Sequence, residues 1–83
     1  MSATKDEKYL IKLYELALKA GDPTQEIDRY KVGKEIGQNP KGVDAIVKNL
    51  MQSNFLKKGD EENFIYLTEG GLSLIKLLRT GKS

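Results

Sequence analysis

The residues of this sequence that could take part in chemistry are mainly lysines, and they are unevenly distributed. Seven of the 14 Lys and Arg residues lie between Asp28 and Lys58, with only three acidic residues among them, although the net charge of the chain is only +2. Such a local excess favours a surface that binds a polyanion through phosphate contacts. The alternative is that each of these lysines is an ordinary solvated side chain.

Hydrolytic, redox and metal chemistry have little support in the composition. The chain contains no Cys and no His, so it offers no thiolate nucleophile, no Ser-His-Asp triad and no imidazole metal ligand. Its one dense acidic stretch, "GDEEN" at Gly59–Asn63, lacks the ligand spacing of a calcium loop. A site made of carboxylates alone stays open, but the acidic residues are scattered. We therefore expect no enzyme, with no catalytic residue, metal, cofactor or small-molecule substrate.

The length and hydropathy of the chain limit how it can be organised. Its 83 residues suffice for one domain. The sequence has no apolar run long enough to span a bilayer, and the charged start "MSATKDEKYL" does not resemble a signal peptide. We expect a single domain over residues 1–83 in the cytoplasm, with no membrane partner.

The first half of the chain predicts three helices and a short strand. Thr4 and Glu7 have the spacing of a capping box, and Gly21 can end the helix that starts there. Ile27 is a candidate for a brief strand. A short helix is expected over about 30–36, and Asn39 followed by a proline is typical of the start of the next one.

The second half predicts a hairpin and a last helix. Asn54 can end the third helix in a left-handed conformation. The runs "FLKK" and "NFIYLT" are rich in β-forming residues and flank the polar "GDEEN". Thr68 is a candidate cap for a strongly apolar final helix, in which two glycines weaken the first turn. These elements predict an α+β fold that is mostly α.

The stretch "KEIGQNPKGV", residues 34–43, resembles the turn of a helix-turn-helix. A small residue, a glycine four positions later and a β-branched residue six positions after that are typical of such units, and Gly33, Gly37 and Val43 occupy these positions here. Downstream, "YLTEGGLSLIK" is similar to the Leu-Thr-x-x-Gly passage of the winged helices in the MarR, ArsR and PadR groups. The resemblance implies a winged helix, with a helix-turn-helix over about 30–53, a wing over about 55–67 and a C-terminal helix over about 68–80.

This resemblance implies a transcriptional regulator whose third helix enters the major groove of double-stranded DNA. Lys41 and Lys48 are the main candidates for DNA contact, and Lys31 and Lys34 are candidates for backbone phosphates. The full set of expected DNA-binding residues is Lys31, Lys34, Asn39, Lys41, Gly42, Asp44, Ala45, Lys48, Lys57 and Lys58.

Some features depart from a usual DNA-binding surface. The expected wing tip, Asp60 to Glu62, is acidic, and no Arg lies in the third helix to read guanine. Asp44 could accept a hydrogen bond from cytosine, or it could lower non-specific affinity. The alternative function is therefore a winged-helix module that binds protein and not DNA.

Two further expectations concern aromatic and apolar residues. Tyr9 and Tyr66 could stack on a partner, although burial is the favoured interpretation for both. The first and last helices carry more apolar residues than one buried face needs, which favours a homodimer formed through these helices.

Overall fold

The structure of the protein is a computed structural model that describes residues 4–80, and over that range it has four helices and one three-stranded sheet. In chain order the elements are α1 (Lys5–Ala20), β1 (Ile27–Asp28), α2 (Arg29–Glu35), α3 (Pro40–Gln52), β2 (Leu56–Lys58), β3 (Phe64–Leu67) and α4 (Glu69–Thr80). The sheet is antiparallel with the order β1-β3-β2. The expected α+β, mostly helical fold class is confirmed.

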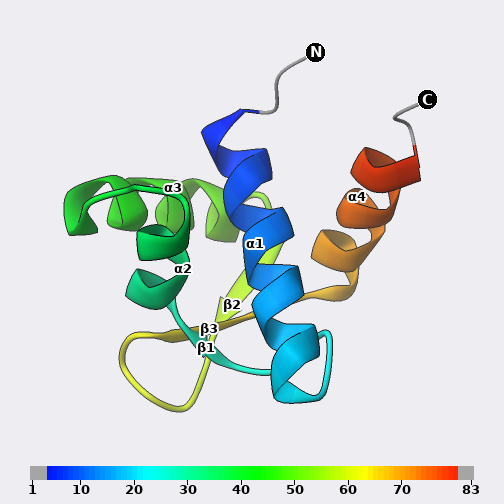
Figure 1. Ribbon diagram of the computed structural model, residues 1–83, viewed down its shortest axis with the longest axis horizontal. Coiled ribbons are helices and arrows are strands. Elements are labelled where there is room, and N and C mark those ends of the chain that lie inside the picture. The colour runs from blue at the N-terminus through cyan, green and yellow to red at the C-terminus, as the bar shows by residue number, and fades with distance from the viewer. Residues whose placement is uncertain (1–3, 81–83) are drawn as a thin grey trace.

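Helix α1 lies between the α2–α3 pair and α4 (Figure 1) and packs against the other three helices and against β1 and β3. It begins with the expected capping box: the Glu7 amide donates to the Thr4 hydroxyl at 3.1 Å, and the Thr4 amide donates to the Glu7 carboxylate at 2.9 Å. It ends at Gly21, whose φ of 123° suits only glycine. Both predicted ends of this helix are confirmed.

Helices α2 and α3 are joined by a tight turn. Asp28 caps α2 by accepting a hydrogen bond from the Tyr30 amide at 2.9 Å, so α2 begins and ends one residue earlier than expected. Gly37 has a φ of 75°, as the turn requires. Gly33 is equally constrained, because a Cβ there would overlap the Val43 side chain of α3. The two helices can approach this closely only because position 33 carries no side chain.

The chain leaves α3 and enters the hairpin through Asn54, whose backbone is left-handed with a φ of 67°. In the hairpin, Leu56 pairs with Leu67 and Lys58 pairs with Ile65. The Thr68 hydroxyl donates to the Asn54 carbonyl oxygen at 2.6 Å and accepts from the Gly71 amide at 3.1 Å. Thr68 therefore caps α4 as expected, and it also ties α4 to the end of α3.

The core is a single cluster at the junction of α1, α3 and the sheet. Tyr9 is fully buried in it, which confirms the favoured interpretation for this residue. Ile36 is half-buried at the C-terminal end of α2 and packs on the cluster from outside. The buried members are Tyr9, Leu10, Leu13, Ala17, Ile27, Val32, Val43, Ile46, Val47, Leu50, Leu56, Ile65, Leu67 and Ile75.

None of the helices between residues 4 and 80 is both long enough and apolar enough to cross a membrane.

Candidate nucleic-acid interface

The outward face of α3 carries a row of three of the expected site residues. Lys41, Ala45 and Lys48 are exposed and follow one another at spacings of four and three, so they lie on the same side of the helix. The two lysines are roughly 10 Å apart along the axis, given the rise of 1.5 Å per residue. The methyl group of Ala45 leaves the space between them open. Gln52 continues this row and is exposed, and extending the same helical period in the sequence would have found it.

Two expected site residues, Asn39 and Gly42, form the hydrogen bond that caps the start of α3. The Asn39 side-chain oxygen accepts a hydrogen bond from the Gly42 amide at 2.8 Å and so caps the helix. Asn39 is exposed, but Gly42 is half-buried, which corrects its expected exposure. A Cβ at Gly42 would come within 2.5 Å of the Gln38 side chain. The Gln38 side chain is flexible, so the part that Gly42 plays in the turn is its amide, which donates to Asn39.

Lys31 and Lys34 lie on α2 beside a groove between α2 and α3. Both are exposed, and the hollow of about 440 Å³ that they line is also lined by Asp28, Tyr30, Gln38, Pro40 and Val43. The structure thus brings the α2 lysines to the start of α3, where the two helices meet. The groove therefore presents the ammonium groups of Lys31 and Lys34, together with the Asp28 carboxylate, beside the N-terminal end of α3.

Asp44 is held by the start of α2, which the sequence did not indicate. The Tyr30 hydroxyl donates to Asp44 Oδ1 at 2.8 Å, and Arg29 Nη1 lies 3.9 Å from the same oxygen. The hydrogen bond to Asp44 is the main cause that raises the pKa of Tyr30. The Asp44 side chain is 56 % exposed and that of Arg29 only 16 % exposed. Asp44 is therefore accessible but fixed in orientation, with a partly buried positive charge beside it.

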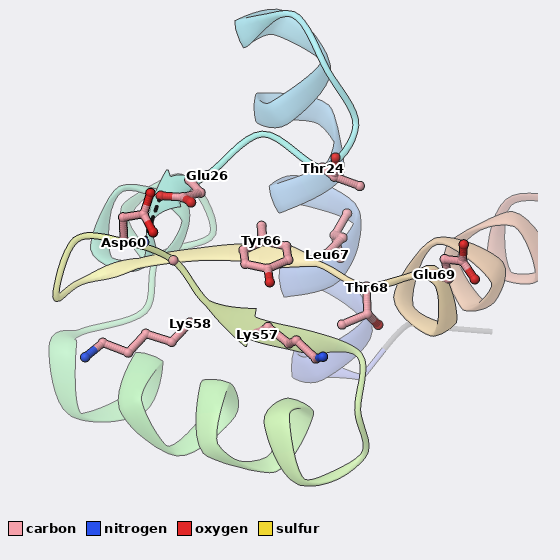
Figure 2. A pocket seen from close by; sticks show the side chains of 10 residues that line it. Thr24, Glu26, Lys57, Lys58, Asp60, Tyr66, Leu67, Thr68 and Glu69 are labelled. Carbon is pink, nitrogen blue, oxygen red and sulfur yellow. Dashed lines mark hydrogen bonds between the residues drawn. The ribbon is translucent and has the colours of Figure 1, made fainter.

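Lys57 and Lys58 lie in a different groove, on the open side of the sheet (Figure 2). This groove has a volume of about 530 Å³ and is also lined by Glu26, Asp60 and Tyr66. The two lysine side chains extend in opposite directions along β2, while Glu26 and Asp60 lie together near the hairpin tip. None of the residues that line it also lines the groove between α2 and α3. The hairpin lysines therefore belong to a surface of mixed charge, apart from the α2–α3 groove.

The hairpin tip is acidic and anchored. Asp60, Glu61 and Glu62 are exposed, and the Asp60 amide donates to Glu26 Oε1 at 3.1 Å. Within residues 4–80 no group of acidic side chains is arranged to hold a metal ion. Tyr66 is half-buried in the neighbouring groove, so part of its ring stays accessible.

Comparison with known proteins gives no relative, since no family model, no curated protein and no solved structure matches this chain.

Proposed function

We propose that this chain is a winged helix-turn-helix domain that binds double-stranded DNA through α3 and acts as a transcriptional regulator. The observation that carries the proposal is the exposed row of Lys41, Ala45 and Lys48 on α3, next to the groove that Lys31 and Lys34 line. A helix of this length fits the major groove, which admits an α-helix. In this proposal β2 and β3 form the wing.

In this proposal the lysines of α2 and those of α3 have different roles. Lys31 and Lys34 neutralise phosphates and set the register of the protein on the duplex, while Lys41 and Lys48 reach base edges or the opposite backbone. Lys57 and Lys58 contribute less, because Glu26 and Asp60 share their groove and partly cancel their charge. Non-specific affinity is therefore expected to be modest and strongly dependent on salt.

The test is fluorescence anisotropy of a labelled mixed-sequence duplex over a series of salt concentrations. The wild-type chain should bind at low salt. Lys31→Ala together with Lys34→Ala should reduce the magnitude of the slope of log K against log salt by about 2, roughly one unit for each lysine that no longer meets a phosphate. Lys41→Ala together with Lys48→Ala should weaken binding as well. The matched control is Lys5→Ala with Lys8→Ala, which removes two exposed lysines from α1. No binding by the wild type even at low salt would remove the proposal.

A second candidate function is a winged-helix module that binds a basic protein segment. The observation in its favour is the acidic hairpin tip, beside a hollow of about 520 Å³ lined by Asp22, Glu26, Glu61 and the half-buried ring of Phe64. This function predicts that a Lys- and Arg-rich peptide binds in the same anisotropy assay while duplex DNA does not. Replacing Glu61 and Glu62 by Gln should then abolish peptide binding, and unchanged peptide binding would argue against it.

A further inference from the structure

Asp44 is the only acidic residue of α3, and it lies at the edge of the proposed DNA-binding face. An unrestrained carboxylate at this place would repel phosphates and swing between many rotamers. The structure shows a restrained one, because Tyr30 donates to Oδ1 at 2.8 Å and Arg29 Nη1 lies 3.9 Å away. We call these three residues the Asp44 clamp.

Asp44 can still accept further hydrogen bonds while Tyr30 and Arg29 hold it. An ionised carboxylate has room for about four hydrogen bonds over its two oxygens. The Tyr30 hydroxyl uses one site on Oδ1, and the side chain as a whole remains 56 % exposed. Because Tyr30 fixes the rotamer before any ligand arrives, little side-chain entropy is left to lose on binding. Arg29 offsets part of the negative charge, which weakens repulsion from the phosphates nearby.

We propose that Asp44, oriented by Tyr30 and Arg29, is a specificity-determining residue that selects cytosine by accepting a hydrogen bond from its N4 amino group in the major groove. The inference rests on the proposed function, since it requires α3 to lie in the groove. Thymine and guanine present acceptors at their major-groove edges, which repel a carboxylate, and adenine places the N7 acceptor beside its amino donor, which weakens the hydrogen bond that a carboxylate can accept there. Cytosine alone offers a donor without a neighbouring acceptor of its own.

The test combines selection of bound duplexes from a randomised pool with anisotropy on single-site replacements. The wild-type chain should select C at one position, and replacing that base pair should weaken binding roughly five- to 150-fold, the range for one well-placed base contact. Asp44→Asn supplies a donor and an acceptor on a side chain of the same shape, so the preference at that position should move from C towards A. Tyr30→Phe keeps the ring but frees Asp44, and it should shrink the discrimination without moving it to another base.

The control is Asp60→Asn, which makes the same charge change at the hairpin tip and should leave the base preference as in the wild type. Circular dichroism of each variant confirms that it is folded. If Asp44→Asn selects the same base as the wild type at every position, this inference is wrong while DNA binding itself stands. If the wild type binds no duplex at low salt, the proposed function and this inference fall together.

Discussion

The Tyr9 side chain could either stack on a partner or pack in the core, and its surroundings show that it packs in the core. Its ring is fully buried, and its hydroxyl donates to the Arg29 carbonyl oxygen at 2.8 Å. The hydroxyl thereby satisfies a backbone acceptor at the start of α2, next to the residues that hold Asp44. Tyr9 is an anchor between α1 and α2, and stacking on a partner is excluded by its burial.

The burial of Tyr9 predicts a specific loss of stability at alkaline pH. Burial is the main cause that raises the pKa of Tyr9 above its ordinary value near 10. The folded state therefore holds this proton more tightly than the unfolded state does. The stabilisation is complete below pH of about 10 and is lost as the pH rises above that value towards the folded pKa.

Tyr9→Phe should lower the free energy of unfolding at neutral pH by about 1 kcal/mol, because one hydrogen bond is removed. The same variant should lose less stability than the wild type between neutral pH and pH values above about 10. Urea unfolding followed by circular dichroism measures both. Tyr14→Phe removes a hydroxyl from a half-buried ring on the same helix and leaves the buried Tyr9 hydroxyl in place, so it is the matched control. Parallel curves for Tyr9→Phe and the wild type would contradict this prediction.

Among the candidate site residues, those on a regular helix could be placed from the sequence and those in a contact between helices could not. The spacing of Lys41 and Lys48 predicts a shared face, and both are exposed there. The partners of Asp44 lie 14 and 15 positions earlier, on α2, and no local pattern links them. That contact depends on how α2 crosses α3, which a single sequence does not specify.

Most helix ends were predictable because the signals that set them are local. The capping box at Thr4, the cap at Asn39 and the left-handed turn at Gly37 each satisfy backbone groups within a few residues. The start of α2 was misplaced by one residue because Asp28 is both the last residue of β1 and the helix cap. A strand that runs directly into a helix leaves no separate signal for the boundary.

The two glycines of α4 could not be told apart from the sequence, and the structure gives them different roles. A Cβ at Gly71 would overlap the backbone carbonyl oxygen of Phe55, whereas a Cβ at Gly70 would meet nothing nearer than 3.5 Å. Only Gly71 is needed for α4 to pack against the residue that precedes β2. The sequence showed only that both glycines weaken a helix. The contact with Phe55 that explains Gly71 joins positions far apart in the chain and could not be inferred from it.

This difference predicts opposite effects of the same substitution at neighbouring positions. Gly71→Ala should lower the free energy of unfolding by about 1–3 kcal/mol, because the backbone at Phe55 has to move away. Gly70→Ala should leave stability unchanged or raise it by up to about 1 kcal/mol, because alanine is the better helix former. Urea denaturation of both variants beside the wild type is the measurement. Equal effects of the two substitutions would show that the close approach to Phe55 is not tightly packed.

The folded structure divides the basic residues into two groups, a division that counting charges along the chain did not reveal. The basic excess between Asp28 and Lys58 divides into the α2–α3 surface and the hairpin lysines. The fold places Glu26 and Asp60 in the groove that Lys57 and Lys58 also line. The expectation that all these lysines serve one surface therefore holds best for α2 and α3, which supports testing Lys41 and Lys48 first.

The apolar surplus of the first and last helices is partly absorbed by their own contact. Helices α1 and α4 pack together, and Leu16, Leu72 and Leu74 lie half-buried against the core. Two large apolar side chains of the described residues remain exposed, Leu18 at 45 % and Leu77 at 67 %. They lie on the two helices that the sequence singled out as a dimer interface, and Leu77, the more exposed of the two, is the position at which the prediction of a homodimer is best tested.

In a two-fold dimer the same patch meets itself, so a single substitution alters the interface from both sides. Leu77→Lys should therefore dissociate the dimer, because burying two ammonium groups without partners costs far more than leaving them in water. The monomer should stay folded, since Leu77 is mostly exposed within one chain. Sedimentation equilibrium at high micromolar concentration should give a dimer for the wild type and a monomer for Leu77→Lys. Gln52→Lys adds the same charge at an exposed position of α3 and should remain dimeric, whereas a monomeric wild type would leave the exposed leucines as isolated surface residues.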